Sequence, residues 1–165
     1  MARLCLVMLM LTAAVLPAPA LGAPAASAAP PGEFLVVPGL SMGPITIGMR
    51  LEAVENIFGD PSKVDPTGQT QWYEWKSPDD HLRSIAVETL QNTVVLISLA
   101  HDPRYRTSQG LGDGTAFMEV RHVLGRPSST IRLGGFSIIQ YRTLGIGFVI
   151  DGSGRVTGII IAPRV

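Results

Sequence analysis

The sequence predicts an α+β protein of two tandem repeats, each a short helix followed by an antiparallel β-meander, with one curved sheet carrying both helices on one face. Three observations predict it. One apolar and glycine–proline pattern occurs twice along the chain, at a shift of 66 residues. Each copy starts with apolar residues at helical spacing, and each continues with short alternating segments between turn residues.

The repeat rests on matched positions. Gly48-Met49 aligns with Gly114-Thr115, and the valine, glycine and proline that follow also align. Five extra residues in the first copy then change the shift to 61. The aligned pairs are Val54 and Val120, Gly59 and Gly125, Pro61 and Pro127, Trp75 and Tyr141, Ile85 and Ile146, and Val87 and Phe148.

The chain begins with an export signal. Arg3 precedes an apolar run from Leu4 to Leu16, and a stretch rich in Ala and Pro follows, which is the layout of a secretory signal peptide. Cleavage fits after Gly22 or Ala28. The lone Cys5 lies in the segment to be removed, so we expect no cysteine in the mature chain.

These features divide the chain into four parts. We assign residues 1–28 to the signal peptide, 29–32 to a flexible lead-in, 33–100 to repeat 1 and 101–165 to repeat 2. The later apolar runs have strand length, so no membrane span is expected after cleavage. A bacterial protein that is secreted, periplasmic or held at the cell envelope is the prediction, and the choice between soluble and attached forms stays open.

Within each repeat the helix comes first. Leu51, Val54, Ile57 and Phe58 share one helical face, and the glycine and proline after them end the helix. Residues 117–124 follow the same pattern. The predicted strands are Gln71–Lys76, Arg83–Leu90, Val94–Ala100, Ser137–Tyr141, Gly145–Ile150 and Val156–Ile161.

Composition limits the function. The chain is 46% hydrophobic, and 13 Lys+Arg balance 13 Asp+Glu, which excludes a disordered chain and argues against nucleic-acid binding. No cofactor and no metal are expected, because the single cysteine and three isolated histidines form no ligand pattern. Residues 33–100 carry a net charge of −5 and residues 101–165 a net charge of +4. This division indicates either a solvated dipolar surface or head-to-tail self-association.

The repeat also sorts the faces of the sheet. Positions that are apolar in both copies should face the helices, so Trp72, Glu74, Ala86 and Glu88 should face away. A tryptophan among carboxylates is a candidate contact surface, and the alternative is that Trp72 covers the neighbouring repeat.

The helix entry carries a family resemblance. Gly48-Met49, Val54 and Gly59-Asp60-Pro61 resemble the repeats of the β-lactamase inhibitor protein family and of the small SmpA/OmlA envelope lipoproteins. The inhibitor family has two such repeats in tandem and displays an acidic residue on a hairpin of the first. The resemblance therefore implies that Asp79 or Asp80 plays that part, whereas by composition Asp79-Asp80 is ordinary turn material.

Two further motifs resemble catalytic or phosphate-binding patterns, but the residues that flank them do not fit those patterns. Gly39-Leu40-Ser41-Met42-Gly43 fits the nucleophile-elbow pattern, but an extended segment rather than a helix follows it. The glycines of residues 110–114 suggest a phosphate loop but lack its lysine, so we expect a flexible joint.

The sequence predicts an exported, non-enzymatic module that presents a sheet face and hairpin tips to a protein partner outside the cytoplasm. The alternatives are a small-ligand carrier, a β-lactamase-type enzyme inhibitor or a small hydrolase. Its expected contact residues are Trp72, Glu74, Asp79, Asp80 and Glu88.

Overall fold

The computed structural model describes residues 34–165. The predicted signal peptide (1–28), the lead-in (29–32) and Glu33 lie outside the described residues. Within the described part the fold is α+β and mostly sheet, as predicted. No helix in this part is long and apolar enough to cross a membrane.

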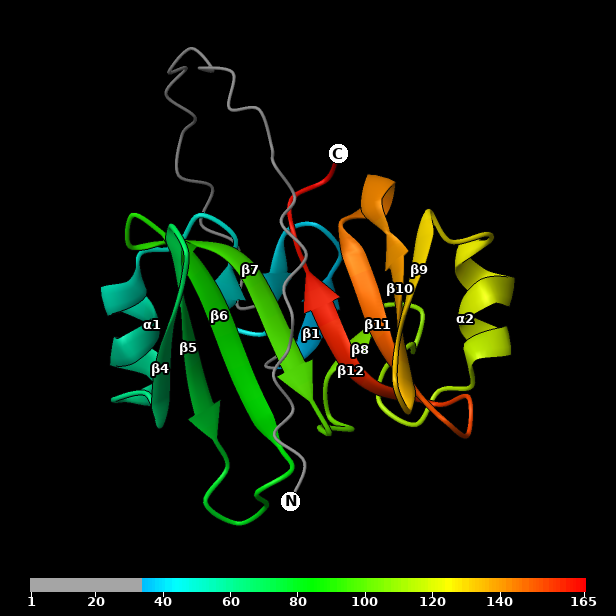
Figure 1. Cartoon of the computed structure of the whole chain (residues 1–165), viewed down its shortest axis with the longest axis horizontal. Helices are drawn as coiled ribbons and strands as arrows, with labels where there is room; N and C mark the ends of the chain where they lie inside the picture. The colour runs from blue at the N-terminus through cyan, green and yellow to red at the C-terminus, as the bar shows by residue number, and fades with distance from the viewer. Residues whose placement is uncertain (1–33) are drawn as a thin grey trace.

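An antiparallel sheet of eight strands forms the body of the molecule (Figure 1). The strand order is β4-β5-β6-β7-β12-β11-β10-β9, so each half of the chain supplies four neighbouring strands. The strands are β4 (Lys63–Thr67), β5 (Thr70–Lys76), β6 (Ser84–Leu90), β7 (Thr93–Ala100), β9 (Ser129–Leu133), β10 (Phe136–Tyr141), β11 (Ile146–Asp151) and β12 (Val156–Ile161).

The two halves of the sheet join where β7 pairs with β12. Ile159 lies opposite Leu99, and Gly158 lies opposite Ala100. A Cβ added to Gly158 would lie 2.8 Å from the carbonyl oxygen of Leu99, so only glycine allows this close approach. The hydrogen-bonded ladder is therefore continuous from one half of the sheet to the other.

A short helix precedes each half-sheet, as the spacing predicts. Helix α1 (Leu51–Phe58) buries Leu51 and Val54, and helix α2 (Phe117–Leu124) buries Val120. Gly59 and Gly125 follow them with φ of 76° and 81°, which favours glycine. The buried stripe is narrower than predicted. Ile57 and Val123 are 45% and 36% exposed, because the i+6 position turns away from the sheet.

Matching hydrogen bonds tie the two helix ends to the sheet. Trp75 Nε1 donates to the carbonyl oxygen of Gly59 at 2.9 Å, and the Tyr141 hydroxyl donates to the carbonyl oxygen of Gly125 at 3.2 Å. Helices of about eight residues are unstable alone, so these contacts and the buried faces hold them in place. In both halves a helix is followed by four strands of the large sheet, and a duplication of one ancestral unit stays a prediction.

The predicted core positions are buried. The four sheet pairs that the sequence analysis assigned to the helix-facing side are all less than a tenth exposed. These residues are Tyr73, Trp75, Ile85, Val87, Ile139, Tyr141, Ile146 and Phe148. Full burial of one such side chain contributes about 1.5–3 kcal/mol.

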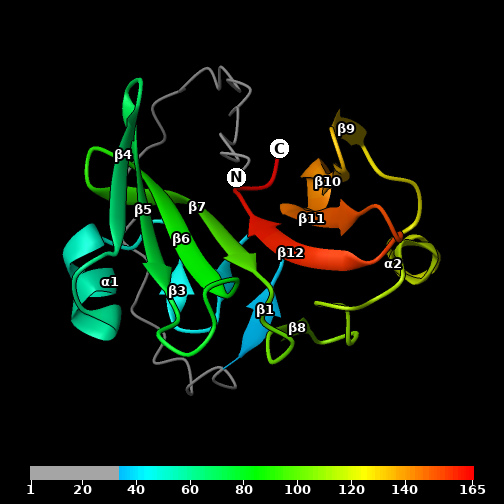
Figure 2. The same ribbon diagram turned by 60° about the horizontal axis from the view of Figure 1, so that its bottom comes forward.

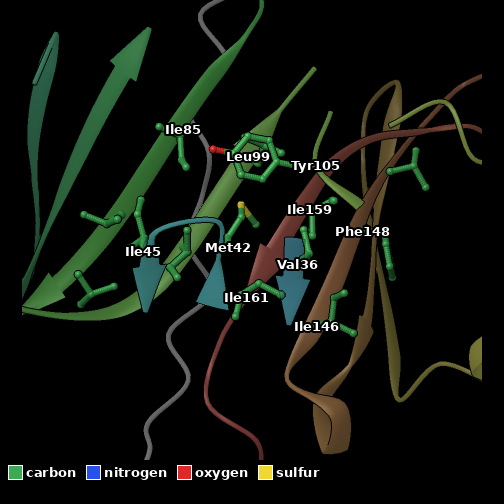
Figure 3. Packing of buried hydrophobic residues seen from close by; sticks show 14 of the residues in the cluster. Val36, Met42, Ile45, Ile85, Leu99, Tyr105, Ile146, Phe148, Ile159 and Ile161 are labelled. Atoms are coloured by element: carbon green, nitrogen blue, oxygen red, sulfur yellow. The ribbon is translucent and has the colours of Figure 1, made fainter. Parts of the chain in front are cut away.

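A second, four-stranded sheet closes the core between the helices, and the sequence did not predict it as a sheet. Its order is β3-β2-β1-β8, with β1 parallel to β8 and the other pairs antiparallel. Figure 2 shows this small sheet on the same side of the large sheet as α1, and the close-up in Figure 3 shows its side chains pointing toward the large sheet. The strands are β1 (Leu35–Val37), β2 (Ser41–Met42), β3 (Ile45–Thr46) and β8 (Arg106–Thr107).

The glycine-rich segment 110–114 is an ordered turn rather than the flexible joint that its composition predicts. Leu111 is fully buried, and its backbone N–H donates to Thr107 Oγ1 at 3.1 Å. Arg106 donates to the carbonyl oxygens of Gly110 and Asp113 at 2.9 and 3.1 Å. These bonds hold the connection between the halves against the small sheet.

Candidate interaction surface

The candidate surface begins on the outer face of the first half-sheet, which we define as the face away from the helices. Trp72 on β5 lies directly across from Asp65 on β4 and Glu88 on β6. Trp72 and Glu74 are both half-buried. The register therefore places these residues on one face, as the repeat predicts.

Trp72 does not cover the second half of the chain. Two strands, β6 and β7, stand between β5 and the first strand of the other half, β12. At about 4.8 Å per strand, this separation is about 14 Å. The part of the Trp72 ring that remains accessible is thus open to solvent or to a partner.

Glu88 faces the same side but makes its contact within the chain. It is 8% exposed, and its Oε1 lies 2.5 Å from Thr70 Oγ1. A carboxylate this buried adds little contact area to a partner. Its role as a contact residue stays a prediction, and the structure gives it a second role in fixing β5 against β6.

The hairpin loop between β5 and β6, residues 77–83, is the tip loop. Asp79 is exposed, whereas Asp80 is half-buried and its Oδ1 accepts a hydrogen bond from the Leu82 N–H at 3.0 Å. The Arg83 N–H donates to the Asp80 carbonyl oxygen at 3.0 Å. This local turn is the one that aspartate favours, and it fixes the shape of the loop.

Leu82 is the tip-loop residue that the sequence analysis missed. It is 69% exposed, next to His81 and three residues after Asp79. The signal for it was an apolar residue inside an otherwise polar turn.

The second half has no equivalent of the tip loop. There, β10 and β11 are joined by a single 3₁₀ turn, η1 (Arg142–Leu144), and Gly145. The extra residues that the alignment places in the first copy are therefore the tip loop. Insertions on a rigid scaffold are common sites of function.

A buried ionic network anchors the tip loop to the connection between the halves. Asp102 is 2% exposed and accepts two side-chain hydrogen bonds from Arg104, at 2.9 and 2.6 Å. Arg83, which ends the tip loop, places its Nε 3.9 Å from Asp102 and its Nη2 3.9 Å from Asp80. The Arg104 guanidinium also lies 4.5 Å from the ring centroid of Phe34.

The network sets the ionisation of Asp102. Burial alone would raise the pKa of its carboxyl group, but the hydrogen bonds from Arg104 and the charges of Arg104 and Arg83 outweigh it and lower the pKa below 3.8. Arg83 Nε is buried without a hydrogen bond. It is therefore held by its charge and by packing rather than by a hydrogen bond.

The motifs that suggested chemistry are used structurally. Ser41 is 3% exposed in β2, between two hairpin turns, and lacks the helix that a nucleophile elbow requires. Across residues 34–165, no three His, Cys, Asp or Glu side chains gather as a metal site would require.

Comparison with known proteins gives a likeness of fold. No protein family model matches the chain, and no curated protein matches it. An extracellular protein containing an SCP domain from Bacillus anthracis matches with a TM-score of 0.51 and 13% identity, over 71% of this chain. A cysteine-rich secretory protein from Staphylococcus aureus matches with a TM-score of 0.50 and 16% identity, over 72% of this chain.

The chain spans 44% of the length of each of these two proteins, so it corresponds to a part of them. At this identity the likeness shows the fold alone. A candidate β-lactamase inhibitor protein from Streptococcus mutans also matches, with 18% identity over 68% of this chain and 81% of that one. Its TM-score of 0.32 is too low to establish a shared fold, so the resemblance to the inhibitor family stays a prediction.

Proposed function

We propose that the chain is an exported, non-enzymatic interaction module that binds a protein partner outside the cytoplasm through the tip loop and the outer face beside it. The tip loop carries the proposal. It presents Leu82 at 69% exposure beside the acidic Asp79, and Arg83 ties it to the buried Asp102.

The tip loop and the outer face beside it combine an exposed apolar side chain, a carboxylate and a tryptophan, which are features common in protein-binding surfaces. An exposed apolar side chain on a rigid loop gives contact area without a large loss of conformational entropy. The carboxylate of Asp79 gives orientation and speeds encounter with a basic partner. Trp72, farther along β5, extends the apolar contact onto the sheet face.

The location outside the cytoplasm has separate support. The N-terminal residues have the layout of a signal peptide. Two solved structures of similar fold are described as an extracellular protein and a secretory protein.

The test is affinity capture with matched variants. The full chain, which keeps residues 1–28 so that it can be exported, is tagged at its C-terminus, expressed in its own host, cross-linked and purified. The tip variant is Asp79→Lys with Leu82→Asp, and the control applies the same changes to the opposite hairpin, Thr143→Lys with Leu144→Asp. The control is matched because Leu144 is also exposed, at 36%.

The wild-type chain and the control should capture the same near-stoichiometric partner, and the tip variant should lose it. Trp72→Ala should weaken capture by about tenfold or more. Retention of the partner by the tip variant would refute the proposal. Capture of a second copy of the chain alone would replace it with head-to-tail self-association.

A further inference from the structure

A groove lies in the second half of the chain, between α2 and strands β9 and β10, far along the sheet from the tip loop. Its volume is about 500 Å³. Three arginines line it: Arg121 from α2, Arg126 from the turn after the helix, and Arg132 from β9. The lining contains no acidic side chain.

Among the described residues, the arginines of this groove have no hydrogen-bond partner for their side chains, whereas Ser128 accepts from the Arg142 N–H and Ser129 donates to Gln140 Oε1. Arg121, Arg126 and Arg132 form no side-chain hydrogen bond or ion pair with another residue of 34–165. The guanidinium carbon of Arg121 lies 5.9 Å from the centroid of the Phe117 ring, and its charge also acts on the Tyr141 hydroxyl. Arg132 lies directly across from Ser137.

Two hydroxyl groups add neutral donors. Thr130 and Ser137 both line the groove, and neither side chain is hydrogen-bonded within the described residues. Thr130 lies across from the core residue Ile139, so both hydroxyl-bearing positions are on the helix-facing side of the sheet.

The first half of the chain provides an internal comparison. At the shift of 66, Glu55 stands where α2 has Arg121, and Asp60 stands where the second half has Arg126. Both acidic residues occupy the same positions on a helix and turn of the same geometry. The positive charge of the groove is therefore not a consequence of the fold, because the fold accepts the opposite charge at two of its positions.

A second cavity lies at the turn ends of the strands in the first half; no residue of α1 lines it, and it shares the aligned positions Pro66 and Gln71 with the groove. Its volume is about 320 Å³, and no charged residue lines it. Pro66 takes the place of Arg132, and Gln71 takes the place of Ser137. The Tyr73 hydroxyl donates to Gln71 Oε1, so a larger polar side chain that is already hydrogen-bonded stands where the groove has Ser137.

We propose that this arginine groove binds a small anionic ligand that carries two linked phosphate groups. Guanidinium groups bind phosphate through paired, charge-assisted hydrogen bonds, and the hydroxyl groups can donate to further phosphate oxygens. Three positive charges would be poorly compensated by a single carboxylate. A volume of about 500 Å³ lies in the range of small-molecule sites.

The test is isothermal titration calorimetry of the chain from Ala29 with inorganic pyrophosphate, inorganic phosphate and citrate. Pyrophosphate should bind with one-to-one stoichiometry and more tightly than phosphate or citrate. The groove variant, Arg121→Glu with Arg126→Asp, gives the groove the charges of the first half. The control, Arg50→Glu with Lys76→Asp, makes the same change in net charge at two exposed positions in the first half.

The groove variant should bind pyrophosphate about 100-fold more weakly, since each lost charge-assisted contact lowers affinity by about tenfold. The control should stay within about threefold of wild type. Equal weakening in both variants would show non-specific attraction and would overturn the proposal. Citrate binding as tightly as pyrophosphate would also overturn it.

A second measurement does not depend on the variants. In amide-resolved NMR of the wild-type chain, pyrophosphate should shift the resonances of residues 126–132 and leave the tip loop unchanged. Shifts spread over all exposed arginines would contradict the proposal. The groove is separate from the tip loop, so failure here leaves the proposed protein interaction standing.

Discussion

Replacing Asp102 by Asn should destabilise the protein by about 2–3 kcal/mol. Its side chain is 3% exposed and accepts two hydrogen bonds from the side chain of Arg104. Breaking a buried ion pair costs about 3–5 kcal/mol. The expected loss is smaller, because Arg104 and Arg83 have 50% and 32% of their side chains exposed and can regain water.

The assay is urea unfolding followed by tryptophan fluorescence, since both tryptophans lie on β5. Asp79→Asn is the control, and because Asp79 is exposed its change should stay below about 0.5 kcal/mol. A loss below about 0.5 kcal/mol for Asp102→Asn would refute the view that this network anchors the tip loop.

Wild type and Asp102→Asn can also be compared as a function of pH, and the structure predicts the direction in which their stability difference changes. The pKa of Asp102 is lowered in the folded state below its ordinary value of 3.8, so the ionised carboxylate stabilises the fold above that value. This stability is lost as pH falls through the folded pKa. The difference between wild type and Asp102→Asn should be constant above about pH 5 and shrink below pH 3.8. A difference that grows in acid would contradict the assignment.

Four further substitutions test the packing, each by urea unfolding. Gly145→Ala should cost about 3 kcal/mol or more, because φ is 69° and the new Cβ would lie 2.5 Å from the Ala162 carbonyl oxygen. Gly134→Ala should cost only about 1 kcal/mol, because φ is 58° there but no atom lies within 4 Å; equal losses would rule out the close contact. Trp75→Phe should lower the free energy of unfolding by about 2 kcal/mol and Tyr141→Phe by about 1 kcal/mol, because each removes the hydrogen bond to a helix end. An unchanged free energy of unfolding in both variants would show that these bonds do not hold the helices.

Elements with a strong apolar pattern could be predicted from the sequence. The six inner strands and both helices match within one or two residues, because buried positions dictate their periodicity. The edge strands β4 and β9 were missed. Pro66 in β4 removes a backbone donor, which only an edge strand tolerates, and the polar residues of β9 carry no strand pattern.

The small sheet could not be predicted because its strands are only two or three residues long. Such strands have no periodicity of their own, and they exist through tertiary pairing. β1 pairs with β8, and the two lie about 70 residues apart in the chain. The ordered turn at residues 110–114 has the same cause, since the buried Leu111 and the hydrogen bonds of Arg106 hold it.

The candidate site was partly accessible from the sequence. Alternation along β5 placed Trp72 and Glu74 on one face, but the burial of Glu88 depends on Thr70 from the neighbouring strand. The charge reversal between Glu55 and Arg121 is present in the aligned halves. The groove could not be predicted from the aligned sequences, because its volume depends on how α2, β9 and β10 pack around Ser137.

The most direct test of the central claim is site-specific photo-cross-linking in the native host. A photoreactive residue is placed at Leu82 in the tip loop or at Thr143 in the opposite hairpin, both in exposed positions. The proposed function predicts one dominant cross-linked protein, different from the chain itself, from position 82 and none from position 143. The same product from both positions, or from position 143 alone, would contradict the placement of the interaction surface on the tip loop.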